Sequence, residues 1–110
     1  MRLPNFEQSI IDTAKLRGYC LNSSHPEGRH KARVFFSALG IGPADADWLR
    51  DAILAAIRET EVSSTEQTPY GTRIDVDVVL ERAGRSATVR TGWIVRKSDS
   101  IPRLATCFVK

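Results

Sequence analysis

The sequence contains few of the residues on which disulfide-rich, metal-binding and membrane-spanning proteins depend. Its 110 residues include 2 cysteines and 2 histidines, too few for a disulfide-stapled scaffold or the usual zinc ligand sets, although the two cysteines could still be close in space. It has no apolar run of about 18 residues, as a transmembrane helix requires, and no secretory signal at its start. We therefore expect a reduced, cytoplasmic protein with no membrane segment, metal or cofactor.

The composition is that of one globular domain with a basic bias. Hydrophobic residues make up 42% and charged residues 26% of the sequence, which predicts a single domain over residues 1–110. From Arg82 to Lys110, seven basic side chains accompany a single acidic one, Asp99. This end of the chain is expected to carry positive potential, as an anion-binding face or as a solvated basic surface.

The first half of the chain has the apolar spacing of helices. Three helices are predicted, over Thr13–Leu21, Pro26–Leu39 and Pro43–Glu59. Ser24 and Glu27 have capping-box spacing at the start of the second helix. The apolar positions of that helix fall at i, i+3, i+4 and i+7 and are expected to be buried: Ala32, Phe35, Phe36 and Leu39.

The second half changes to the two-residue period of strands. After a polar stretch over 63–67 and a turn over 69–71, three strands are predicted, over Arg73–Leu80, Ser86–Arg96 and Arg103–Val109. Their short connections allow only antiparallel neighbours. The predicted class is α+β, with two to three N-terminal helices packed on a C-terminal antiparallel β-meander of three to four strands.

Basic and titratable side chains gather at the start of the second predicted helix. They are His25, Arg29, His30, Lys31 and Arg33. Free backbone N–H groups at a helix N-terminus already attract anions, so cations at the same place fit a phosphate ligand. Histidine can transfer protons and lysine can stabilise charge on a phosphate. A solvated charged helix face is the alternative interpretation.

Two threonines in the predicted sheet are the second candidate site. Thr91 and Thr106 each alternate with apolar neighbours along their strand, so both hydroxyls are expected on the covered side of the sheet. They fit either a site or a pair of core hydroxyls bonded to the backbone. Trp93 likewise fits a core position or the stacking of a base, and Arg90 fits either a phosphate contact or an ion pair across the hairpin.

Four short motifs together support a family resemblance. They are His25-Pro-x-Gly-x-x-Lys31-Ala, Thr68-Pro-Tyr-Gly71, Val89-Arg-Thr-x-Trp-Ile94 and Pro102-Arg-Leu-x-Thr106. With this set, which spans nearly the whole chain, the sequence resembles a bacterial domain family of polymorphic-toxin and phage-associated proteins. That family is in turn similar to the barnase, EndoU, colicin and RelE superfamily of ribonuclease toxins.

The resemblance implies a metal-independent endoribonuclease toxin that cleaves tRNA or mRNA by attack of the 2′-hydroxyl on the adjacent phosphate. It also implies a small acidic antitoxin or immunity protein as partner. The residues expected in catalysis are His25, His30, Lys31, Thr91 and Thr106, and those expected to bind substrate are Arg29, Arg33, Arg90, Trp93, Arg96 and Arg103. If a strand carboxylate serves as general base, Asp75 and Asp77 are the candidates. A non-catalytic nucleic-acid or protein-binding module and a phage-assembly accessory protein are the alternatives.

Overall fold

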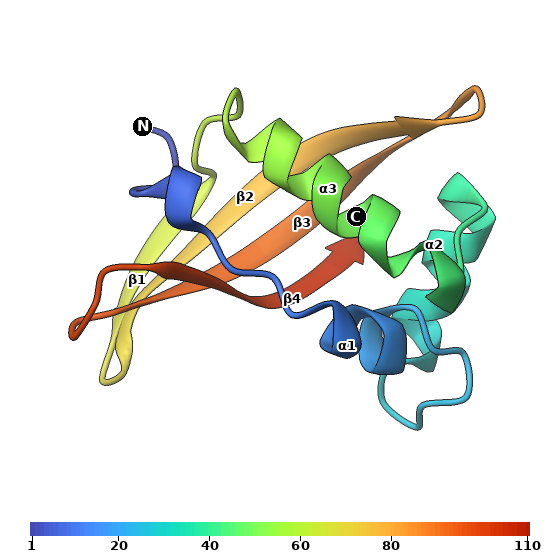
Figure 1. Cartoon of the computed structure of the whole chain (residues 1–110), viewed down its shortest axis with the longest axis horizontal. Coiled ribbons are helices and arrows are strands. Elements are labelled where there is room, and N and C mark those ends of the chain that lie inside the picture. The colour runs from blue at the N-terminus through green and yellow to red at the C-terminus, as the bar shows by residue number, and fades with distance from the viewer.

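The computed structural model describes residues 1–110 and confirms the predicted α+β class, with helices followed by a four-stranded antiparallel sheet (Figure 1). The helices are α1 (Thr13–Lys15), α2 (Arg29–Leu39) and α3 (Ala46–Ile57), with a π-helical turn η2 (Leu16–Cys20) directly after α1. Short 3-10 turns lie at η1 (Phe6–Gln8) and η3 (Pro43–Asp45). None of the helices has the length and apolar character needed to cross a bilayer.

The sheet is a meander in the order β1-β2-β3-β4. Its strands are β1 (Ser64–Thr68), β2 (Gly71–Arg82), β3 (Arg85–Arg96) and β4 (Pro102–Val109). Strand β1 lies where the sequence predicted only a polar connection, so that prediction is wrong. All but the last of its five residues are exposed, and a solvated edge strand therefore lacks the apolar alternation from which strands are predicted.

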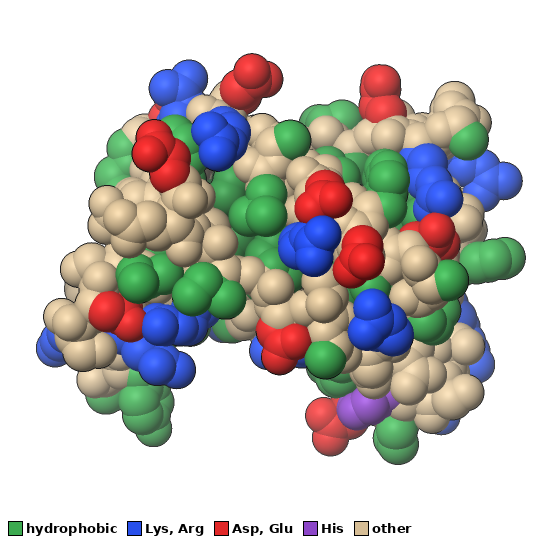
Figure 2. Space-filling view, viewed as in Figure 1, with side chains coloured by type: hydrophobic (Ala, Val, Ile, Leu, Met, Phe, Trp, Pro, Cys, Tyr) green, Lys and Arg blue, Asp and Glu red, His purple; other side chains and the backbone are tan.

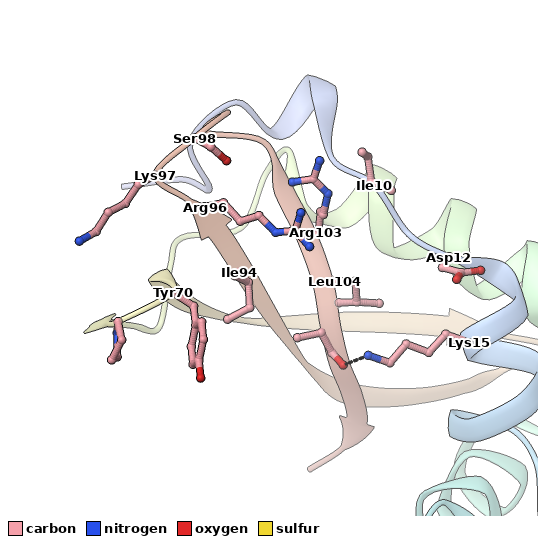
Figure 3. Close-up of a pocket in the computed structure, with 12 residues that line it drawn as sticks. Ile10, Asp12, Lys15, Tyr70, Ile94, Arg96, Lys97, Ser98, Arg103 and Leu104 are labelled. Atoms are coloured by element: carbon pink, nitrogen blue, oxygen red, sulfur yellow. Dashed lines mark hydrogen bonds between the residues drawn. The ribbon is translucent and has the colours of Figure 1, made fainter.

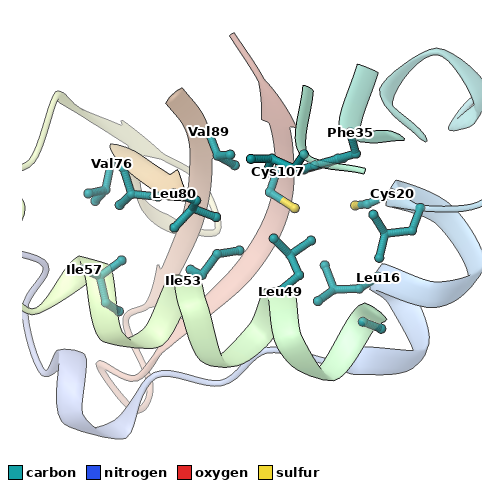
Figure 4. Packing of buried hydrophobic residues seen from close by; sticks show 14 of the residues in the cluster. Leu16, Cys20, Phe35, Leu49, Ile53, Ile57, Val76, Leu80, Val89 and Cys107 are labelled. Atoms are coloured by element: carbon teal, nitrogen blue, oxygen red, sulfur yellow. The ribbon is translucent and has the colours of Figure 1, made fainter. Parts of the chain in front are cut away.

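The core lies between α3 and the sheet. Leu49, Ile53 and Ile57 of α3 are fully buried, as are Val76 and Val78 of β2, and Figure 4 shows the α3 side chains pointing at the strands. The predicted alternation of β2 is confirmed, because its core-facing residues are buried while its intervening aspartates are only partly so. One face of the sheet is thus fixed against the helices.

Helix α2 differs from its prediction at the start and on one side. It begins at Arg29 because the imidazole of His25 accepts hydrogen bonds at Nδ1 from the N–H groups of Glu27 and Gly28, both at 3.0 Å. Phe36 is 66% exposed, so its expected burial is wrong. The sheet and the adjoining segments cover only a narrow side of α2, which carries Phe35.

A β-bulge in β4 determines which side of the sheet its residues face. Gly92 pairs with Thr106 and Trp93 with Leu104, which leaves Ala105 as the extra residue. Thr91 pairs with the buried Cys107 and faces the core, so Thr106 faces the opposite side. The expectation that both threonine hydroxyls face the covered side is therefore wrong for Thr106. Simple alternation fails there because the bulge shifts the register by one residue.

The two cysteines join η2 to β4. Cys20 and Cys107 are both buried free thiols, and Figure 4 shows their sulfur atoms facing each other. A hydrogen bond from Cys107 lowers the pKa of Cys20 to about 7. The neighbouring residues Tyr19 and Thr106 are thereby brought to the same edge of the sheet.

Candidate functional site

The helices leave one face of the sheet uncovered. This open face consists of the β2, β3 and β4 residues that alternate with core positions, and the strand register arranges them in rows. Successive rows contain Asp77, Arg90 and Phe108; then Asp75, Gly92 and Thr106; then Arg73, Ile94 and Arg103. Rows on one face of a sheet lie about 7 Å apart, since the rise is about 3.3 Å per residue.

Lys31 lies where α2 meets this open face at the edge strand β4. Its ammonium donates hydrogen bonds to the hydroxyl of Thr106 at 3.1 Å and to that of Tyr19 at 3.4 Å. The same nitrogen lies 4.9 Å from the centre of the Tyr19 ring and 5.8 Å from that of Phe108. Lys31 forms no ion pair with a carboxylate, so a partly buried positive charge is held by hydroxyls and aromatic rings. Two residues predicted from distant motifs are in direct contact here.

His25 joins this cluster through Tyr19. The two rings meet edge to face with centroids 4.8 Å apart. Because Nδ1 of His25 accepts backbone hydrogen bonds, the neutral ring carries its proton on Nε2. Tyr19 was not predicted as a site residue. It stands outside every motif of the sequence, and only the turn η2 brings it next to Lys31.

Gly92 lies in the middle of the open face, where neighbouring side chains pack over its backbone. A Cβ atom at this position would lie 3.0 Å from a guanidinium nitrogen of Arg73, 3.0 Å from the Thr106 methyl group and 3.3 Å from Oδ1 of Asp75. Side chains from β2 and β4 therefore converge over the backbone of β3. Oδ2 of Asp75 accepts a hydrogen bond from Ser64 at 3.2 Å, whereas the buried Oδ1 has no hydrogen-bond partner.

Asp77 has a different environment from Asp75, although both belong to β2. Its carboxylate accepts two hydrogen bonds from Arg90, at 2.8 and 3.1 Å, and one from Lys110 at 3.0 Å. The hydrogen bonds from Arg90, followed by that from Lys110, lower the pKa of Asp77 to about 2. A carboxylate with this pKa is a poor proton acceptor near neutral pH. Of the two predicted carboxylates, Asp75 is the better candidate base.

Two predicted site residues lie in the core, which corrects their assignment. Thr91 and Trp93 are completely buried. The Thr91 hydroxyl donates to the carbonyl of Val76 at 2.7 Å and accepts from the Trp93 indole N–H at 2.9 Å. Neither side chain can touch a substrate in this fold, because both face the helices.

The remaining predicted residues lie outside this cluster, in two places. Arg29, His30 and Arg33 are exposed on α2 and have no hydrogen-bond or ion-pair partner. Arg96 and Arg103 line an open cavity of about 780 Å³ at the other end of β3 and β4 (Figure 3). The hydrogen bond and ion pair with Asp99, at 2.8 Å, raise the pKa of Arg103 further above its usual range.

Charges of both signs are mixed on the helix-covered side. In Figure 2, basic and acidic side chains alternate across this side of the molecule. Arg82, for example, donates to Asp45 at 3.0 Å. The molecule contains no group of three or more histidine, cysteine, aspartate or glutamate side chains arranged to hold a metal ion. The Lys31 cluster, defined here as Tyr19, His25, Lys31, Arg73, Asp75 and Thr106, is the candidate site.

Comparison with known proteins assigns a family to the chain. Residues 2–110 match the family model described as Domain of unknown function (DUF6883). The chain belongs to this family. No curated protein matches it. A chain in the solved structure "Contact-dependent growth inhibition toxin - immunity protein complex from Klebsiella pneumoniae 342" is 16% identical, with a TM-score of 0.70 over 96% of each chain. DUF6883 therefore shares its fold with a component of that complex.

Proposed function

We propose that this DUF6883 domain is a metal-independent endoribonuclease toxin and that the Lys31 cluster is its active site. The observation that carries the proposal is the contact between Lys31 and Thr106 beside Gly92, over whose backbone Arg73 and Asp75 also converge. This arrangement offers two cations, Lys31 and Arg73, for a phosphate, and the carboxylate of Asp75, which pairs with Arg73 at 3.6 Å, for a proton. The fold shared with a component of a toxin–immunity protein complex supports the toxin assignment.

In the proposed reaction, the RNA 2′-hydroxyl attacks the adjacent phosphorus and its proton passes to the carboxylate of Asp75. The bond from phosphorus to the 5′-oxygen breaks, which leaves a 2′,3′-cyclic phosphate and a 5′-hydroxyl end. Lys31 and Arg73 stabilise the negative charge that grows on the phosphate. Nε2 of His25, which carries the proton of the neutral ring, donates a hydrogen bond to the leaving oxygen. That oxygen takes its proton from water, and the hydroxide left behind recovers the proton held by Asp75.

The test compares variants of the cluster for cleavage of a labelled oligoribonucleotide and for growth arrest on expression. Lys31→Ala and Asp75→Asn should each lower the cleavage rate about 10²- to 10⁴-fold while circular dichroism and thermal unfolding stay close to wild type. His25→Ala should lower it, whereas the matched variant His30→Ala should not, because His30 is exposed and has no partner. Cleavage should continue in EDTA and leave a cyclic phosphate.

Three outcomes would contradict this function. Full cleavage by both Lys31→Ala and Asp75→Asn would place the reaction elsewhere. Loss of cleavage with chelator would mean that a metal is required. Binding of RNA without any cleavage by the wild type would instead support the binding-module alternative.

The partner expected for such a toxin is a small acidic immunity protein that covers the open face. Lys31 has no carboxylate partner within this chain, and an acidic side chain from another protein could supply one. Co-expression with an immunity protein of this kind should restore growth. If the chain itself protects cells from another toxin and causes no growth arrest, it has the role of the immunity protein and the proposed function is wrong.

A further inference from the structure

The second feature of the open face is the cavity at the far ends of β3 and β4. Its volume of about 780 Å³ is in the range of small-molecule binding sites. The β1–β2 turn, the β3–β4 loop and the N-terminal segment around Ile10 form its walls. Figure 3 shows Arg96 and Arg103 in the middle, with Tyr70 and Ile94 on one side and Lys15 on the other.

The charge of this cavity favours an anion. Four cationic side chains line it, namely Lys15, Arg96, Lys97 and Arg103, with one acidic residue, Asp12. Oδ1 of Asp12 accepts a hydrogen bond from the backbone N–H of Ala14. Arg103 is paired with Asp99, whereas Lys15, Arg96 and Lys97 form no ion pair. A ligand carrying phosphate would meet three cations that form no ion pair within the chain.

The cavity also offers an aromatic and an apolar surface. The side chain of Tyr70 is 82% exposed at the β1–β2 turn. Ile94 lines the same cavity from β3. An exposed tyrosine beside cations is a typical platform for a nucleobase, because every base has a π-face that can stack on it.

The strand register places this cavity next to the Lys31 cluster. Ile94 pairs with Arg73 on one side and with Arg103 on the other, and Gly92 lies two residues before it on the same face. The cavity therefore begins one row, about 7 Å, from the row that contains Asp75 and Thr106. Ala105, which lines the cavity, is the immediate neighbour of Thr106.

We propose that this cavity binds the RNA nucleotide that flanks the scissile phosphate, with its base on Tyr70 and Ile94 and its phosphate on Arg96 and Lys97. This inference rests on the proposed ribonuclease function, since it names where the rest of that substrate lies. We therefore expect the enzyme to prefer single-stranded RNA that extends beyond the two nucleotides joined by the scissile phosphate. A paired base could not reach Tyr70.

The experiment measures binding of a fluorescent single-stranded tetradeoxynucleotide, which lacks the 2′-hydroxyl and cannot be cleaved by the proposed reaction. Tyr70→Ala and Arg96→Ala should each weaken binding about tenfold or more. The matched controls are Phe36→Ala, an exposed aromatic on α2, and Arg85→Ala, at the opposite end of the same strand. Both controls should bind as the wild type does.

A second probe separates stacking from charge. With an abasic tetranucleotide, Tyr70→Ala should bind as the wild type does, while Arg96→Ala should still bind more weakly. If the two cavity variants bind the normal tetranucleotide like the wild type, or the wild type does not bind it, the inference is overturned. If binding depends on Tyr70 but the wild type never cleaves RNA, the cavity assignment stands and the proposed catalysis is wrong.

Discussion

Replacing the buried Thr91 by valine tests whether the two threonines of the family motifs have different roles. Valine keeps the shape of the side chain and removes the hydroxyl. In the folded protein that hydroxyl connects the Val76 carbonyl to the Trp93 indole, at 2.7 and 2.9 Å. Its removal leaves the indole N–H without a partner in a fully buried position.

The expected cost follows from that unpaired donor. An unsatisfied buried polar group costs about 1–3 kcal/mol, and the shorter bond to the Val76 carbonyl is lost as well, so we expect a total loss of about 2–4 kcal/mol. For a domain of this size, 1 kcal/mol corresponds to about 4 °C in the melting temperature. Thr91→Val should therefore unfold about 8 to 16 °C below the wild type, as measured by circular dichroism or calorimetry.

Thr106→Val is the matched variant on the other side of the sheet. Thr106 is only half-buried and accepts one hydrogen bond, from Lys31, so its loss should cost less than about 1 kcal/mol. RNA cleavage should fall in this variant, because the hydroxyl positions the Lys31 ammonium. Thr91→Val should retain its cleavage rate per folded molecule at temperatures below its unfolding transition.

Any of three results would refute this distinction. A Thr91→Val protein as stable as the wild type would show that the buried bridge does not stabilise the sheet. A Thr91→Val protein that is stable but inactive would show that Thr91 takes part in RNA cleavage. A large loss of stability in Thr106→Val would place that hydroxyl in the structural core instead.

Two further changes test the environment of the site. Hydrogen bonds from Arg90 and Lys110 lower the pKa of Asp77 to about 2, so the stability that Asp77 contributes is fully present above its unfolded pKa of about 4 and is lost as the pH falls through 2. Asp77→Asn should lower the free energy of unfolding by about 2 kcal/mol at pH 7. Its urea midpoint should vary less than that of the wild type between pH 4 and 2. Equal pH dependence in both proteins would contradict the low pKa of Asp77. Gly28→Ala should destabilise by about 2 kcal/mol, because its Cβ would lie 2.2 Å from the Tyr19 carbonyl oxygen. Gly18→Ala is its control, since no atom lies within 4 Å of the added group, and equal melting temperatures for the two variants would refute the expected clash.

The periodicity of the sequence predicted the parts of the fold in which one face is buried. The alternation in β2 and the apolar spacing of α3 identified core positions correctly, because both elements pack against each other. Strand β1 has no buried face and left no such signal. Phe36 was misplaced because a helix at the end of a sheet buries a narrower stripe than one lying across it.

The candidate site could be predicted only in part for a related reason. Lys31 and Thr106 were identified from separate motifs, and the structure brings them into contact. Their companions Tyr19 and Arg73 come from segments whose approach depends on the η2 turn and on the absence of a side chain at Gly92. The side on which Thr106 lies depends on the bulge at Ala105, which a two-residue period cannot represent.

Oδ1 of Asp75 is buried without a hydrogen bond, which lowers the stability of the fold. A buried carboxylate oxygen without a hydrogen bond is unfavourable, and Nε of Arg73 lies 3.6 Å away, too far for a hydrogen bond. Such groups persist where a function needs them. Asp75→Asn should therefore lower the free energy of unfolding by less than about 1 kcal/mol, or raise it. The same variant should lose RNA cleavage. Urea unfolding of Asp75→Asn beside Asp77→Asn measures the contrast, since the second aspartate has all its partners and should be costly to replace. If Asp75→Asn is the more destabilising of the two, the carboxylate of Asp75 serves the fold and the proposed base must be sought elsewhere.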